Sequence, residues 1–177
     1  MKNKTDYKWL IKIVLVSIAA SIAFTFASSK ILGLAGHVVA LAILLVFIAI
    51  GIVFDVIGVA VAAASEAPFH SMAAHRERGA AESLRLIKNA DKVTSFCNDV
   101  VGDVSGIISG ATAALIAARL MEGFGMENLL FPLIISGAVT GLTVGGKAAG
   151  KTYAFNKSTK IVLRVGKLIN LFHLNKR

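Results

Sequence analysis

The chain has 177 residues, of which 56% are hydrophobic and 16% charged, and its mean hydropathy is +0.75. Soluble domains carry about 25% charged residues, so this composition excludes a soluble globular protein. The net charge of +9 would suggest nucleic-acid binding in a soluble protein. In such an apolar chain, however, the lysine and arginine residues set membrane topology and contact anionic lipid. We therefore expect the lipid bilayer as a partner and no nucleic acid. The lone cysteine, Cys97, excludes an intramolecular disulfide.

Two segments without Asp, Glu, Lys or Arg, residues 13–29 and 31–54, follow each other on either side of Lys30. Because about 20 apolar residues cross a bilayer, each is long enough to span it. The first could instead be a signal peptide, but cleavage would need a short apolar core followed by a small-residue site, and this segment runs directly into a second span. The sequence therefore predicts an uncleaved first membrane helix.

The third apolar segment, residues 104–118, is short for a membrane span. At 1.5 Å per residue it covers only about 22 Å. To cross the hydrocarbon core the helix must begin near Val93, and it then carries three polar residues into the membrane. These residues are Asn98, Asp99 and Asp103.

A fourth span is expected over residues 128–146, and basic residues predict how all four are oriented. Lysine and arginine gather before the first span, between the second and third, and after the fourth. Only Lys30 and Arg119 flank the other side. By the positive-inside rule, the sequence predicts a multi-pass protein of the cell (plasma) membrane with both termini cytoplasmic.

Two further segments have a helical pattern outside the spans. Residues 66–92 are charged and helix-forming, with Pro68 ending the preceding helix, and they predict a juxtamembrane helix at the cytoplasmic surface. Residues 157–177 predict a basic amphipathic helix that lies in the membrane interface or packs on the cytoplasmic segment. Its apolar face consists of Ile161, Val165, Leu168 and Phe172. The predicted fold class is an all-α integral membrane protein with four transmembrane helices.

Small and polar residues recur at helical spacing on the last three spans. The second span carries Gly51, Asp55, Gly58, Ala62 and Ser65. The third carries one stripe of Asn98, Gly102, Ser105 and Ser109, and a neighbouring stripe of Asp99, Asp103, Gly106 and Gly110. The fourth carries Gly137, Gly141 and Gly145. Such stripes are typical of close helix packing, and we expect the glycines of the fourth span to meet another helix.

Three carboxylates at membrane depth, Asp55, Asp99 and Asp103, indicate more than packing. An ionised aspartate in the bilayer costs several kcal/mol unless it is paired, solvated or bound to a cation. Carboxylate, amide, hydroxyl and glycine carbonyl oxygens suit a hard cation, Mg²⁺ or alternatively Na⁺. The structural alternative is an ion pair with Lys147 or Lys151. No nucleophile–base motif or Walker spacing is present, so we expect no enzyme.

Short motifs along residues 45–170 support the cation interpretation. Ala64-Ser65-Glu66, Arg78-Gly79-Ala80 in a basic segment, and Cys97-Asn98-Asp99-Val100-Val101 occur in this order. The chain thereby resembles the transmembrane domain of the CNNM and CorB/CorC magnesium transporters. The resemblance implies a homodimer that holds a dehydrated cation, with Ser65 and Asn98 as ligands and Asp99 at a position where the family has asparagine. The three aspartates and a glycine carbonyl oxygen are added to these ligands. The expected ligand set is Asp55, Ser65, Asn98, Asp99, Gly102 and Asp103.

The chain also departs from that family. Lys147 stands where the resemblance implies a glutamate ligand, and Gly150 where it implies proline. We expect a small stand-alone form without CBS domains, in three parts. These parts are an N-terminal tail and extra helix (residues 1–36), a CNNM-like membrane domain (37–156, including 66–92), and the amphipathic helix (157–177).

Three functions are open at this point. The first is a cation transporter with its site between the second and third spans. The second is a non-transporting subunit that has lost the metal site and binds another membrane protein. The third is a pore-forming or membrane-remodelling protein, favoured only by small size and the amphipathic tail.

Overall fold

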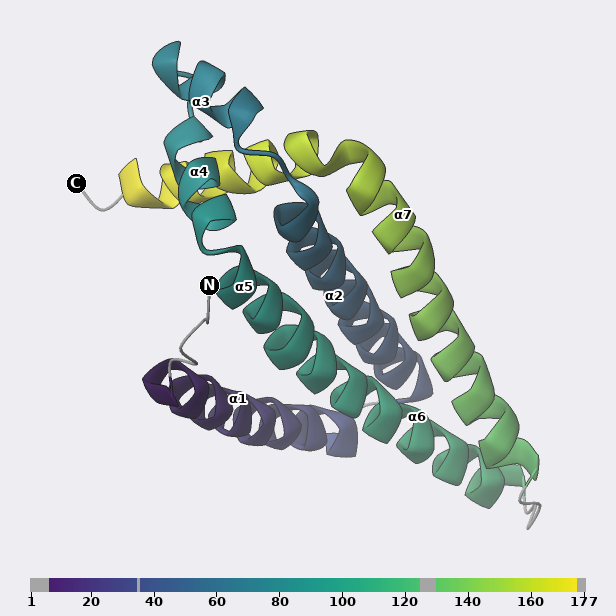
Figure 1. Ribbon diagram of the computed structural model, residues 1–177. Coiled ribbons are helices and arrows are strands. Elements are labelled where there is room, and N and C mark those ends of the chain that lie inside the picture. Colours follow the sequence, from purple (N-terminus) through teal and green to yellow (C-terminus); the bar gives the residue numbers. More distant parts are fainter. Residues whose placement is uncertain (1–6, 35, 125–129, 175–177) are drawn as a thin grey trace. The chain divides into compact units, whose positions relative to one another are not determined.

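The computed structural model describes residues 7–34, 36–124 and 130–174, and these residues form helices and no strand (Figure 1). Four helical segments are long and apolar enough to cross a membrane, which confirms the predicted all-α chain with four membrane-span-like helices. They are Tyr7–Ala27, His37–Ala63, Ala90–Gly123 and Leu130–Phe172. Three parts of the sequence predictions lie outside the described residues. These are the N-terminal lysines Lys2 and Lys4, the expected start of the fourth span at residue 128, and residues 175–177.

The first two spans are the helices α1 (Tyr7–Leu34) and α2 (His37–Ala63). The third is assembled from α5 (Ala90–Ser95), a π-helical segment η1 (Phe96–Gly102) and α6 (Asp103–Phe124). It begins close to the predicted Val93, so the polar residues that follow are helical. The segment expected as one helix over residues 66–92 is divided into α3 (Ala67–Ala74), α4 (Ala80–Lys88) and the start of α5.

The last helix, α7 (Leu130–Leu174), is longer than the sequence predicts. The expected span ends at Gly146, whereas the helix continues to Leu174 and bends at Lys157 (φ −128°, ψ 22°). Residues 147–156 contain alanine and lysine but no proline. Because alanine and lysine favour helix and only proline would interrupt it strongly, the fourth span and the tail are joined through a kink.

The chain forms two compact units, and α2, η1 and α7 each contribute residues to both. The first unit contains residues 1–51 and 100–145. Within it α1 packs on α6, and the rings of Phe24 and Phe47 meet edge to face with centroids 6.2 Å apart. The buried hydrophobic side chains of its part of α2 are Ala40, Leu44 and Ile48, spaced one turn apart. Large apolar side chains of α1 stay exposed, as expected of a surface that contacts lipid.

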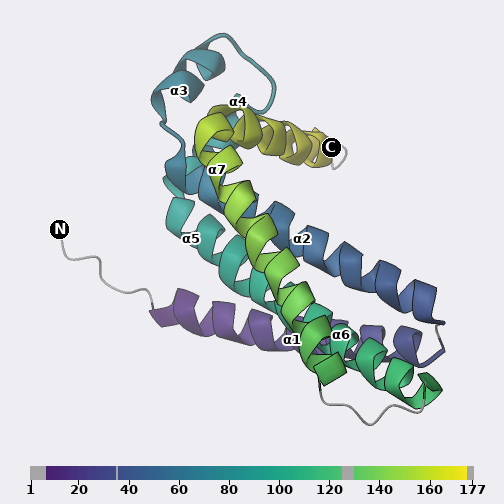
Figure 2. The same ribbon diagram turned by 90° about the vertical axis from the view of Figure 1, so that its right-hand side faces the viewer.

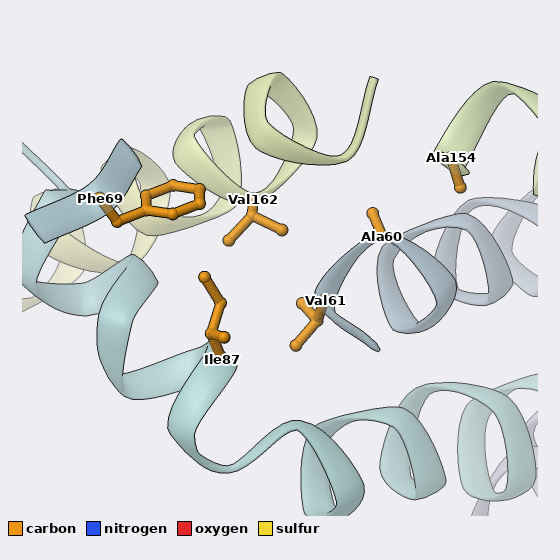
Figure 3. Packing of buried hydrophobic residues seen from close by; sticks show 6 residues of the cluster. All are labelled: Ala60, Val61, Phe69, Ile87, Ala154 and Val162. Atoms are coloured by element: carbon orange, nitrogen blue, oxygen red, sulfur yellow. The ribbon is translucent and has the colours of Figure 1, made fainter. Parts of the chain in front are cut away.

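The second unit contains residues 52–99 and 146–177. In both views α3 and α4 lie beside the C-terminal part of α7 (Figures 1 and 2). Its core draws one or two side chains from α2, α3, α4 and α7, and Phe69 and Val162 are fully buried at its centre (Figure 3). The core consists of Ala60, Val61, Phe69, Ile87, Ala154 and Val162. These contacts hold the short helices α3 and α4 against α7.

Glycines permit the closest contacts in the second unit. Gly79 has a positive φ of 82°, and a Cβ atom there would collide with the α7 backbone at Gly166 and Lys167. Gly166 in turn faces Ser83, whose hydroxyl donates to the carbonyl oxygens of Gly79 (2.8 Å) and Val162 (3.1 Å). Because glycine adopts positive φ without steric strain, this turn can end against a helix backbone.

Candidate functional site

Asp55 is the acidic residue of an otherwise apolar helix. It lies within α2, in the second unit, and is 5% exposed. Its Oδ2 atom is fully buried and has no hydrogen-bond partner in the part of the chain that the structure describes. Since buried polar groups are nearly always hydrogen-bonded, a buried unpartnered carboxylate oxygen is an unusual feature that calls for a ligand or another partner.

Asn98 packs against the face of α2 that carries Asp55. It meets α2 at Gly58, about one helical turn after Asp55. A Cβ atom at Gly58 would collide with Asn98 Oδ1 and would lie 3.2 Å from Cys97 Cβ, so the amide group lies directly on the Gly58 backbone. Residues three apart on a helix are neighbours on its surface. The Asn98 amide therefore meets α2 on the face that carries Asp55.

A threonine fixes the same contact. The hydroxyl of Thr94 donates a hydrogen bond of 3.1 Å to the carbonyl oxygen of Gly58. Thr94 and Asn98 are four residues apart, so both meet α2 from one side. The glycine lets the backbones approach, as small residues do between membrane helices.

The amide oxygen of Asn98 is the second unpartnered group. Oδ1 is buried and accepts no hydrogen bond from any described residue. Asn98 lies in the π-helical turn of η1, and such turns are rare and frequently found at functional sites. Two buried oxygens without donors, one of them from a carboxyl group, make a local environment that suits a positive ion.

The other predicted ligands are placed differently. Ser65 is exposed in the link between α2 and α3, and Asp99 and Asp103 are exposed on η1 and α6. Gly102 is buried in the first unit, where its carbonyl oxygen would lie 3.9 Å from a Cβ atom at Gly51. The structure thus places Asn98 on Gly58, on the face of α2 that carries Asp55, within the second unit, and leaves Ser65 exposed in the link after α2.

Two expectations about the acidic residues differ from what is observed. The burial cost predicts a partner for Asp99 or Asp103, yet neither has a hydrogen bond or ion pair to another described residue. The alternative pairing with Lys147 or Lys151 is likewise not made among those residues. Both carboxylates lie on the outside of the single chain, so a partner for them would have to come from outside it.

The donor set indicates which chemistry the site supports. The described residues contain no group of three or more His, Cys, Asp or Glu side chains that could hold a metal. The contact therefore offers one carboxylate together with neutral amide and hydroxyl oxygens. Hard cations accept such oxygens and retain water as further ligands, whereas zinc and copper need nitrogen or sulfur.

Sequence reasoning missed Thr94. The signal was present in its four-residue spacing from Asn98, which places both on one helical face. Comparisons with known proteins add no further information, because the chain matches no protein-family model, no curated protein and no solved structure.

Proposed function

We propose that the chain is a multi-pass membrane protein that binds and moves a cation, Mg²⁺ or alternatively Na⁺, at Asp55 and Asn98. The observation that carries the proposal is the pair of buried oxygens, Asp55 Oδ2 and Asn98 Oδ1, which have no hydrogen-bond partner among the described residues. The cell membrane and cytoplasmic termini follow from the distribution of lysine and arginine.

The physical basis is the free energy of an unpaired charge. A buried carboxylate without a partner is unfavourable by several kcal/mol in a membrane, and a bound cation compensates that penalty. Asp55 would supply charge, while Asn98 would supply an amide oxygen in place of a water ligand. A single aspartate neutralises one positive charge, so Mg²⁺ would keep some of its water.

Release of the ion requires this contact to open. The Thr94 hydrogen bond and the packing of Asn98 on Gly58 hold α2 against the third span. Small residues at such a contact allow one helix to shift along another without a steric barrier. The movement we propose is a displacement of residues 94–98 from Gly58, which exposes Asp55 to water.

A homodimer is part of the proposal. The exposed stripe of Asp99, Asp103, Gly106 and Gly110 joins two carboxylates to two glycines at which a Cβ atom would meet no described atom within 4 Å. Carboxylates facing lipid are too unfavourable to be stable. A second copy that covers this stripe, or water held between the copies, would remove the penalty.

The test is cation-dependent thermal stability of the purified protein in detergent. We expect MgCl₂ or NaCl to raise the melting temperature saturably, beyond the effect of choline chloride at equal ionic strength. Asp55→Asn keeps the size of the side chain and should abolish this response. Asp91→Asn removes the same charge from an exposed position outside both the ligand set and the dimer stripe, and this matched control should retain the response. No saturable response in the parent would overturn the proposal.

A non-transporting partner subunit is the second candidate. The open glycine faces and Lys147 in place of the expected glutamate favour it. It predicts that Asp55→Asn changes neither cation response nor activity but that substitutions on the open glycines weaken association with another membrane protein.

A further inference from the structure

The second unit contains a groove that the cation proposal does not use. It has a volume of about 750 Å³ and lies between the turn at Glu77 and Arg78 and the last part of α7. From α7 it is lined by Arg164, Lys167 and Leu168, among others. Its walls thus come from segments far apart in the sequence.

The close glycine contact explains why these segments meet. Gly79 ends the turn directly on the backbone of Gly166 and Lys167. Ser83 then joins the two elements through its hydrogen bonds to Gly79 and Val162. The side chain of Arg78, immediately before Gly79, is therefore carried to the same place as the basic residues of α7.

Charge in the groove is only partly compensated. The ammonium group of Lys167 donates to the Glu77 carboxylate at 3.0 Å, and Asn170 donates to Glu82 at 2.9 Å. Arg78 and Arg164 have no ion pair with any described carboxylate. Two guanidinium groups without acidic partners line one cavity, and guanidinium binds phosphate through paired N–H donors.

The remaining lining is apolar. Leu168 and Leu171 are 58% and 64% exposed, although they line the groove. Leucine side chains left open beside arginine suit a molecule that has both a charged group and a hydrocarbon chain. A small phosphorylated metabolite would leave these leucines in contact with water.

We propose that this groove binds one anionic phospholipid, whose phosphodiester contacts Arg78 and Arg164 and whose acyl chain lies on Leu168 and Leu171. The site is independent of Asp55. A lipid headgroup is the favoured occupant because the chain carries four membrane-span-like helices, so anionic lipid is present at high local concentration. The same phosphate chemistry in a free anion is the competing source.

The experiment titrates delipidated protein in neutral detergent with phosphatidylglycerol or phosphatidylcholine of equal chain length, and native mass spectrometry counts the bound lipids. Two further arms contain inorganic phosphate and glycerol 3-phosphate at the same concentrations. We expect one phosphatidylglycerol to bind with an affinity that exceeds that of phosphatidylcholine, and the two water-soluble anions to compete only weakly.

Variants locate the site. Arg78→Gln with Arg164→Gln should reduce phosphatidylglycerol affinity by roughly thirtyfold, from two lost arginine contacts. The matched control, Arg85→Gln with Lys160→Gln, removes the same charge from exposed residues outside the groove lining and should change affinity by less than about threefold. Circular dichroism and melting without lipid check that both variants fold.

Three results would overturn the inference. Equal losses in both double variants would indicate general surface attraction instead of a site. Full competition by inorganic phosphate would indicate a free-anion site without lipid selectivity. Equal binding of the two lipids by the folded parent would remove any role for the arginines. None of these results depends on cation binding, so they are distinct from failure of the proposed function.

Discussion

Most glycines of the first unit have open space around them, whereas those of the second unit have close neighbours. In the second unit a Cβ atom at Gly58, Gly146 or Gly150 would collide with side chains of the neighbouring helix, and at Gly79 or Gly166 with the backbone. In the first unit a Cβ atom at seven glycines would meet nothing described within 4 Å. These seven are Gly36, Gly106, Gly110, Gly123, Gly137, Gly141 and Gly145, whereas a Cβ atom at Gly51 would lie 3.3 Å from Ser105 Cβ.

The difference separates two uses of one residue type. Glycines with a close neighbour fix contacts within the chain, and their substitution should change folding. Glycines with open space make no such contact, so their substitution should leave the folded chain unchanged and affect only what binds to it. Alanine is also favoured over glycine in a helix by about 0.5–1 kcal/mol, which makes the second group a sensitive control.

The largest expected effect is that of Gly79→Ala. An L-residue pays about 1–2 kcal/mol at positive φ, and overpacking adds about 1–3 kcal/mol, because the obstructing atoms belong to the α7 backbone. We expect a loss of about 3 kcal/mol in the free energy of unfolding, measured by denaturant titration in detergent. Gly141→Ala serves as the control and should be neutral or slightly stabilising. An unchanged midpoint for Gly79→Ala would contradict the packing described.

Gly58→Ala should have a smaller effect on stability and a specific effect on the site. The new methyl group collides with the amide oxygen of Asn98, which can rotate away. We expect a loss of about 1 kcal/mol after the gain in helix propensity is included. Rotation moves the amide oxygen away from its position on Gly58, so under the proposed function cation-dependent stabilisation should fall more than folding stability does.

The control for Gly58→Ala is Gly106→Ala, which adds the same methyl group at a glycine of the third span with open space around it. It should retain both stability and cation response. A full cation response in Gly58→Ala would show that Asn98 is not a ligand, while leaving Asp55 a candidate.

Much of the fold could be predicted from apolar runs, because membrane spans depend on length and hydropathy. The position of Asp55 on one stripe with Gly58 also followed from helical periodicity. The π-helical turn at Asn98 could not be predicted, since widening one turn depends on packing and leaves no repeat in the sequence.

The glycine face of the fourth span shows where a pattern is ambiguous. Two sets of glycines at four-residue spacing follow one another along α7. The first set is Gly137, Gly141 and Gly145, and the second is Gly146 and Gly150. The expectation of close packing was placed on the first set, but within the described chain it is the second that meets α2, at Ile52 and Val56. Identical spacing makes both sets suitable for packing, and only the neighbouring helix decides between them.

The smallest effect on the single chain is expected for Gly141→Leu, which tests whether the open face binds a second copy. No described atom obstructs the new side chain, so the melting temperature of the dissociated protein should change by less than about 2 °C, as for a surface substitution. If the face lies between two copies, the leucine prevents close backbone approach, and the dissociation constant of the dimer in detergent should rise about tenfold or more.

Leu142→Ala, one residue away at an exposed site, removes bulk instead of adding it and should not weaken the dimer if Gly141 is the contact. Equal dimerisation of the parent and Gly141→Leu would mean that this face contacts lipid, and the dimer would then depend on the stripe of Asp99, Asp103, Gly106 and Gly110.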